Sequence, residues 1–186
     1  MIKTDISYYP LINVFCRMIS EKVVPAINES TTRLLRAINR FSSRSFNEVQ
    51  PEGNWNPGQI AEHLLLTDIF ISRILQRDLE FAGRKTDEKV SLIKEIFEDN
   101  EQKLNAPEST IPSDMLKDPV TMQEKISRER HFIVQYLGTI EEDSICSGYS
   151  HPEFGRLTIT EWSWYIVYHT MRHVHQLEKL SEAVVN

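Results

Sequence analysis

Cysteine is scarce in this sequence, and long apolar runs and an excess of positive charge are missing. Only Cys16 and Cys146 occur among 186 residues. Two cysteines cannot form the disulfide framework of a small secreted protein, so we expect a reducing, cytoplasmic location and a packing role for both thiols. No run of about 18 apolar residues occurs, and the opening MIKTDISYYP lacks the apolar core of a secretory signal. We therefore expect no membrane partner.

The charge balance argues against a nucleic-acid partner. The chain has 21 basic and 27 acidic side chains, for a formal net charge of −6, and it contains no basic block. Proteins that bind nucleic acids usually show a basic patch. The length suits a single domain over residues 1–186, and a hydrophobic fraction of 40% is enough for one sizeable core.

Several common catalytic motifs are also absent. The sequence contains no GxSxG nucleophile elbow, no GxGxxG dinucleotide fingerprint, no P-loop and no HExxH zinc motif. Neither cysteine lies in a recognisable motif, so we expect neither to be a nucleophile. Any chemistry must therefore come from another set of side chains.

Apolar residues recur at helical spacing in four long segments, and strand signals are poor. The segments are residues 25–41, 56–75, 122–137 and 158 to near the C-terminus. Residues 86–104 predict a further, more exposed helix, and three prolines make 105–119 a long irregular connection of a kind that is often functional. This pattern predicts an all-α fold, an antiparallel four-helix bundle with an extra helix or long loop between its second and third helices.

Two of these segments begin with clear helix-start signals. Asn56 can cap the second segment, Pro57 suits its first helical position, and Gln59 stands where a capping box needs it. Thr158 and Glu161 form the S/T-x-x-E box of the last segment. We therefore expect these two helices to be well defined at their N-terminal ends.

Three of the six histidines fall in YHTMRHVHQ, residues 168–176. His169 and His173 are four residues apart, so a helix that turns about 100° per residue places them on one face. Two imidazoles at this spacing can bind one metal ion. His175 points to roughly the opposite side, which favours a solvent-facing or packing role.

A third metal ligand would have to come from another helix, and His63 is the best candidate. It follows Ile60 by three residues and precedes Thr67 by four, so it points at or beside the apolar stripe. Bundles build metal sites from side chains on facing helices. His63, His169 and His173 would form a site with open positions, as catalytic sites have. The alternative is that each is an ordinary histidine satisfied by a local partner, since H-x3-H also arises by chance.

Gln176 and Arg172 are the candidate catalytic residues beside these ligands. Gln176 follows His173 by three residues and shares its face, so it can hydrogen-bond a bound water or a substrate. A plain helix-surface glutamine is the alternative. Arg172 points about 100° away from His173 and is either a salt-bridge partner or a binder of a substrate carboxylate.

The remaining polar and aromatic candidates have weaker signals. We expect Glu62 and Glu161 at helix surfaces, although either can orient a ligating imidazole through its second nitrogen. We expect His131 to be exposed, and His151 to be a solvated loop residue, a turn contact or a residue at the mouth of the site. The tryptophans are expected in the core or as pocket walls: Trp55, Trp162 and Trp164.

Two stretches resemble the DinB-like superfamily, in the branch similar to YfiT. They are NWNPGQIAEHLLLTD, with a tryptophan before a capped helix that carries an inward histidine, and HPEFGRLTITEWSWYIVYHTMRHVHQLEKL, with H-x3-H-x2-Q on the final helix. The likeness runs from about residue 25 to residue 180. It implies a four-helix bundle with a divalent metal ion held by three histidines, which fall here on His63, His169 and His173.

The same resemblance implies a metal-dependent hydrolase, or a thiol S-transferase that acts with bacillithiol or mycothiol. Three neutral imidazoles on Zn²⁺ or Ni²⁺ leave the ion its full charge, so it can activate water or a low-molecular-weight thiol toward a small-molecule substrate. Both routes need the same open metal, so the ligands do not separate them. A non-catalytic metal-stabilised module that binds a small ligand or dimerises is the alternative, and a homodimer is compatible with either.

Overall fold

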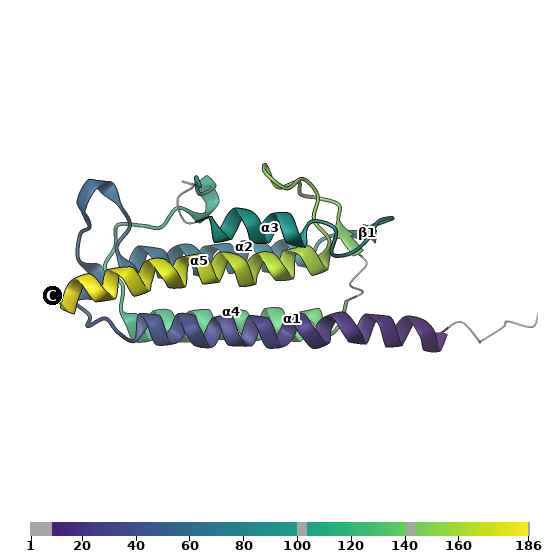
Figure 1. Cartoon of the computed structure of the whole chain (residues 1–186), viewed down its shortest axis with the longest axis horizontal. Helices are drawn as coiled ribbons and strands as arrows, with labels where there is room; N and C mark the ends of the chain where they lie inside the picture. The colour runs from purple at the N-terminus through teal and green to yellow at the C-terminus, as the bar shows by residue number, and fades with distance from the viewer. Residues whose placement is uncertain (1–8, 100–103, 141–143, 186) are drawn as a thin grey trace, which may run out of the picture.

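The computed structural model describes residues 9–99, 104–140 and 144–185. The helices are α1 (Tyr9–Ile38), α2 (Pro57–Leu75), α3 (Val90–Glu98), α4 (Pro119–Leu137) and α5 (Ile159–Val185). The strands are β1 (Leu79–Phe81) and β2 (Ser144–Cys146), and short 3-10 turns lie at η1 (Ser45–Asn47), η2 (Pro51–Gly53) and η3 (Glu108–Thr110). The predicted all-α bundle is confirmed, with α3 as the extra helix between its second and third members (Figure 1).

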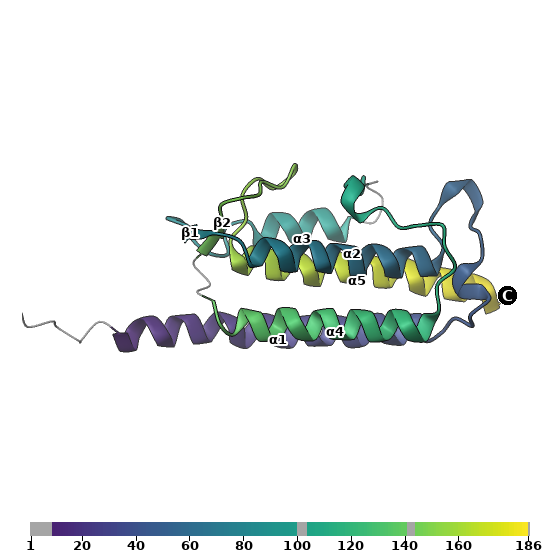
Figure 2. The ribbon, with the colours of Figure 1, turned by 180° about the vertical axis from the view of Figure 1, so that it is seen from behind.

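The four long helices form two layers. One layer contains α1 and α4, the other contains α2 and α5, and α3 and η3 lie on the outer side of α2 and α5 (Figures 1 and 2). Within the bundle, α1 packs against α4 and α5, and α2 packs against the same two helices. The layer of α2 and α5 therefore lies between the bundle core and the covering segments.

Two apolar clusters fill the interior, one toward each end of the bundle. The hairpin-end cluster lies near the β strands and takes from the four helices Ile27, Ile71, Ile133 and Ile166, among others. The far-end cluster takes from the same helices Leu34, Leu64, Ile126 and Leu177, among others. It follows that α1 and α5 run in one direction, while α2 and α4 run in the opposite one. No helix of the described chain has both the length and the apolar character needed to cross a bilayer.

Both predicted capping boxes are present. The Asn56 side chain accepts the Gln59 N–H at 2.8 Å, and the Gln59 side chain accepts the Asn56 N–H at 3.0 Å. At α5, Thr158 Oγ1 accepts the Glu161 N–H at 3.1 Å, and Glu161 Oε2 accepts the Thr158 N–H at 2.9 Å. These bonds pair backbone donors that a helix start leaves open, so they fix where the two histidine-bearing helices begin.

The first helix is longer than the sequence predicted. Pro25 suits a helix start or a kink, but it lies inside a helix that begins at Tyr9. A proline inside a helix removes one backbone hydrogen bond and costs about 3 kcal/mol. Burial of Val23 and Ile27 on either side of Pro25 opposes that cost. The side chain of Cys16, which also falls in α1, lies outside the described residues.

The short strands were not predicted, and the third helix is shorter than expected. β1 pairs antiparallel with β2, with Leu79 opposite Cys146. Strands of three residues are too short to produce a periodic signal. Cys146 is fully buried, which confirms its packing role. α3 ends at Glu98, and residues 100–103 of the predicted helix lie outside the described residues.

Candidate metal centre

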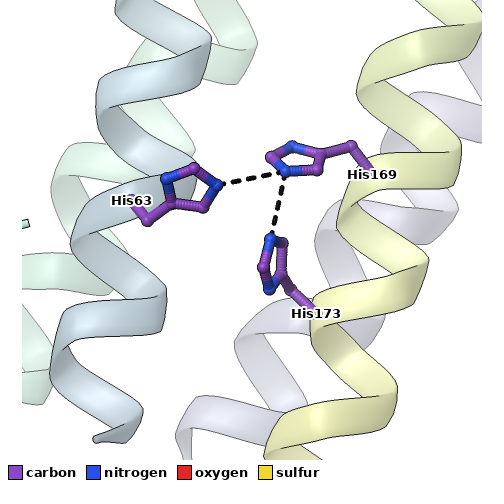
Figure 3. A group of neighbouring side chains, drawn as sticks. All are labelled: His63, His169 and His173. Atoms are coloured by element: carbon purple, nitrogen blue, oxygen red, sulfur yellow. Dashed lines mark hydrogen bonds between the residues drawn. The ribbon is translucent and has the colours of Figure 1, made fainter. Parts of the chain in front are cut away.

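Three imidazoles from two helices converge between α2 and α5. His63 comes from α2, and His169 and His173 come from successive turns of α5 (Figure 3). The Nε2 atoms of His63 and His169 are 3.1 Å apart, and those of His169 and His173 are 3.0 Å apart. One nitrogen from each ring lies within 4.8 Å of the other two. All three side chains are buried, with 4%, 6% and 6% exposure respectively.

Hydrogen bonds at Nδ1 fix the tautomer of two of these rings. His63 Nδ1 lies 2.8 Å from the Thr110 carbonyl oxygen, and His173 Nδ1 lies 2.7 Å from Gln176 Oε1. Both oxygens can only accept, so in the neutral ring each Nδ1 carries the proton and each Nε2 presents a lone pair. Both of these lone pairs are directed toward His169 Nε2 (Figure 3).

His169 cannot satisfy both neighbours as a neutral ring. Its Nε2 has either one proton or one lone pair, so at least one of the two short contacts has no proton between its nitrogens. A cation shared by three lone pairs removes this conflict. For Zn–N bonds of about 2.0–2.1 Å in a tetrahedral arrangement, the nitrogens would be separated by roughly 3.3 Å, close to what is observed. The donor set therefore fits a small divalent ion.

Burial keeps the three imidazoles neutral, which is the form that binds metals. Desolvation lowers the pKa of His63, against the opposing effect of the Thr110 hydrogen bond. Desolvation also lowers the pKa of His169 well below its ordinary value and that of His173 to about 3. Charge on the neighbouring imidazoles contributes to the lowering of both pKa values. No proton has to be displaced from a charged ring at neutral pH.

Aromatic side chains pack against the histidines. The Trp55 ring lies 4.8 Å from that of His63, between centroids. Phe97 of α3 and Tyr165 of α5 lie 5.1 and 5.4 Å from the His169 ring. Trp55 is therefore a wall of the site, one of the two roles predicted for it. These rings limit access of water to the imidazoles and so strengthen electrostatic interactions there.

The irregular segment between α3 and α4 forms hydrogen bonds with two consecutive residues of α2, Glu62 and His63. Thr110 in η3 supplies the carbonyl that holds His63. The preceding residue, Glu62, accepts the Ser113 N–H at 2.6 Å and pairs with Lys117 Nζ at 3.1 Å. Glu62 thus fastens the segment that orients His63, and it does not touch an imidazole itself.

Gln176 and Arg172 both lie beside the three histidines. The Gln176 side-chain oxygen holds His173 Nδ1. Arg172 Nη1 donates to the Asp99 carbonyl at 2.5 Å, just after the end of α3, and its charge contributes to the lowered pKa values of His169 and His173. Their catalytic roles stay predictions.

Glu161 is not a surface residue, contrary to the prediction. Its side chain is fully buried, and Arg84 binds both carboxylate oxygens at 2.6 Å. The Lys89 N–H donates to the same carboxylate at 2.8 Å. The loop between β1 and α3 packs over the start of α5 and buries Glu161. Helical periodicity cannot predict that a separate loop covers a helix surface. The imidazole-orienting role considered for Glu62 and Glu161 falls to Thr110 and Gln176 instead.

The other histidines lie away from the convergent group. His131 is exposed, as predicted, and His175 is half-buried and not part of the group. His151 Nδ1 accepts the Glu153 N–H at 3.1 Å, which is the turn contact among its predicted roles, and burial lowers its pKa to about 4. Trp162 is buried in the hairpin-end cluster, and Trp164 packs at the margin of that cluster.

Thr67 is a polar residue near the site for which the sequence suggested only a place on the apolar stripe. It lies on α2 one turn after His63, and it is 5% exposed. Its Oγ1 has no hydrogen-bond partner among the described residues. An unpaired buried hydroxyl costs about 1–3 kcal/mol. Its four-residue spacing from His63 is the sequence signal that would have singled it out as a contact for a bound molecule.

The fold and these side chains define a class, a four-helix bundle with a buried three-histidine group between two of its helices. The family model of the DinB superfamily matches residues 26–177, and the chain belongs to this superfamily. The chain is 22% identical over 157 residues to the uncharacterized protein YuaE of Bacillus subtilis (strain 168), covering 84% of this chain and 96% of YuaE. No solved structure gives a significant match. The predicted resemblance is confirmed.

We expect the metal-free protein to lose stability as the pH falls below about 6.5. An unfolded histidine titrates near pH 6.5, whereas burial holds the pKa of folded His173 near 3, so unfolding takes up a proton between these values. This group should leave the free energy of unfolding unchanged above about pH 7.5 and lower it by about 1.4 kcal/mol at about pH 5.5. Urea unfolding in the presence of a chelator measures the change.

The variant His173→Gln is the control for this titration. It keeps a polar side chain of similar reach but cannot take up the proton. Its unfolding should therefore take up fewer protons than that of wild type, by up to one, and its free energy of unfolding should depend less steeply on pH. Equal pH dependence of the two proteins would show that His173 is not held neutral by the fold.

Proposed function

We propose that this protein is a metal-dependent enzyme in which His63, His169 and His173 hold one divalent ion, either Zn²⁺ or Ni²⁺. The observation that supports this most directly is the convergence of three Nε2 atoms, in which at least one of the two short contacts has no proton between its nitrogens. Imidazole nitrogens suit both metals. Three ligands leave a position open on a four-coordinate ion, as in catalytic sites and unlike closed structural ones.

The ion and the protein contribute different parts of the chemistry. A divalent ion bound by three neutral ligands supplies a Lewis acid that lowers the pKa of a bound water or thiol. The Thr110 carbonyl and the Gln176 side chain hold two of the rings in their ligating orientation and raise the basicity of their Nε2 atoms. The aromatic walls limit competing water.

We assign the contacts with the substrate to three polar side chains near the ligands. The unpaired hydroxyl of Thr67 can donate to or accept from a bound molecule. The side-chain NH₂ of Gln176 can donate to the same molecule while its oxygen holds His173. Arg172 supplies positive charge for an anionic group of the substrate.

We place thiol transfer ahead of hydrolysis. Within the described side chains, a thiol of the protein itself is a poor candidate, because Cys146 is fully buried and burial raises its pKa to about 11. A low-molecular-weight thiol would therefore be the co-substrate, which suits the reducing, cytoplasmic location inferred from the cysteine content. The ordering of the two reactions rests on analogy with thiol-using members of the family. A homodimer stays a prediction.

Metal content tests the ligand assignment. Wild-type protein should bind about one divalent ion per chain, and His63→Ala, His169→Ala and His173→Ala should each lose it, because two imidazoles hold an ion too weakly to survive dialysis. His175→Ala is the matched control from the same helix and should retain the metal. Retention by all three ligand variants, measured by mass spectrometry of the dialysed proteins, would refute the site.

Gln176 tests the orientation of His173. Gln176→Ala should weaken metal binding by about 10- to 100-fold, because the ring loses its Nδ1 acceptor. Gln176→Glu keeps an acceptor oxygen and should bind within a few-fold of wild type. Competition with a chromophoric chelator gives both dissociation constants, and equal affinity of Gln176→Ala and wild type would contradict the orienting role.

The reaction class is tested with the metal-loaded protein and a monohalobimane as electrophile, with and without a low-molecular-weight thiol. Metal-dependent conjugation that disappears in His173→Ala supports thiol transfer. Cleavage of esters or amides without any thiol-dependent rate would make the protein a hydrolase. If neither rate appears over a broad panel, the non-catalytic ligand-binding module becomes the better description.

A further inference from the structure

A buried guanidinium connects all four helices at the middle of the bundle. Arg130 of α4 is 3% exposed. Its Nε donates to Asp68 Oδ2 of α2 at 2.5 Å, its Nη2 donates to Thr170 Oγ1 of α5 at 2.6 Å, and its Nη1 donates to Thr31 Oγ1 of α1 at 3.4 Å. Each helix of the bundle thus contributes one polar side chain to a single group, which we call the Arg130 layer.

The donors and acceptors of the Arg130 layer match without ambiguity. The hydroxyl of Thr31 donates to the Ile27 carbonyl at 2.7 Å, and that of Thr170 donates to the Ile166 carbonyl at 2.6 Å. Each hydroxyl proton is therefore used within its own helix, and the oxygen is left to accept from the guanidinium. All of these hydrogen bonds form together in the observed geometry.

The Arg130 layer separates the two apolar clusters. On every helix its residue lies between a member of the hairpin-end cluster and a member of the far-end cluster. The flanking pairs are Ile27 and Leu34 on α1, Leu64 and Ile71 on α2, Ile126 and Ile133 on α4, and Val167 and Val174 on α5. Apolar contacts tolerate small shifts of one helix along another, because they are not directional. The hydrogen bonds of the layer do not tolerate such shifts.

The same layer is close in sequence to the metal-binding histidines on both helices. Thr170 directly follows His169 on α5, and Asp68 is five residues after His63 on α2. A slip of one residue along a helix moves its side chains by about 1.5 Å. Metal–ligand distances tolerate only about 0.2 Å. The position of α5 along the axis of α2 therefore has to be fixed more precisely than apolar packing alone requires.

We propose that Arg130 and Asp68 are positioning residues for the three-histidine site, and that they set the register of α5 against α2 rather than adding to the stability of the fold. Buried ion pairs are weak sources of stability, and apolar replacements of similar volume are often neutral or stabilising. A single buried polar residue that fixes helix register is the best-attested use of such groups. One of the two measurements that test this inference, the affinity for Zn²⁺, rests on the proposed metal site.

The test replaces the pair as a unit, because removing one partner leaves a buried charge that destabilises the protein for an unrelated reason. The double variant Asp68→Leu/Arg130→Met should unfold at the same urea concentration as wild type or a higher one. Its dissociation constant for Zn²⁺ should rise by about tenfold or more, because the ligands are no longer held at one height. The matched control is Glu80→Leu/Arg156→Met, which removes an exposed ion pair and should change neither quantity.

A second measurement does not need the metal. In the metal-free wild type, the imidazole Cε1–H signals of the three histidines should form one sharp set in the NMR spectrum, whereas the double variant should show broadened or multiple sets. If wild-type protein binds no metal, the proposed function fails and this measurement alone decides the inference. Sharp single signals in the double variant, together with wild-type affinity where the wild type binds Zn²⁺, would overturn it.

Thr170→Val keeps the test decisive if the double variant does not fold. Valine has nearly the shape of threonine but cannot accept from Arg130 Nη2. We expect zinc affinity to fall several-fold in this variant and the His169 signal to broaden. Unchanged affinity and an unchanged His169 signal in a folded Thr170→Val protein would also refute the positioning role.

Discussion

Three imidazole nitrogens cannot share the space between α2 and α5 on hydrogen bonding alone. His63 and His173 each use their Nδ1 proton elsewhere, and both direct a lone pair at His169 Nε2 across 3.1 and 3.0 Å. Lone pairs that face each other in a desolvated interior repel, and water is too scarce there to screen them. The surrounding structure has to hold the rings in this arrangement, and the divalent ion that we propose would make it favourable.

Three sets of contacts connect the histidine-bearing helices to the rest of the structure. The irregular segment over α2 supplies the Thr110 carbonyl and is fastened by Glu62 and Lys117. The loop between β1 and α3 is fastened to the start of α5 by the pairing of Arg84 with buried Glu161. From the core side, the Arg130 layer ties the four helices together between two apolar clusters. The three histidines thus lie between contacts from outside the bundle and contacts from inside it.

Much of this could be predicted, and the reason lies in helix geometry. A helix has a fixed period, so the spacing of His169 and His173 placed both on one face, and the stripe around Ile60 and Leu64 placed His63 toward the interior. The capping residues before α2 and α5 defined the helix starts, since their hydrogen bonds are local. The third histidine of the group required the additional knowledge that bundles build sites from facing helices, which the family resemblance also supplied.

The sequence by itself thus determined the four bundle helices, the positions of α2 and α5 along the chain, and the three histidines that face inward. Only the tertiary structure decided which oxygens orient the rings, where Glu161 finds its charge partner and how Arg130 joins four helices. Those contacts link residues that are far apart in the chain, such as His63 with Thr110 and Arg84 with Glu161. Periodicity and capping describe neighbours within one helix, and the partners across helices are set by how the helices and their covering segments pack.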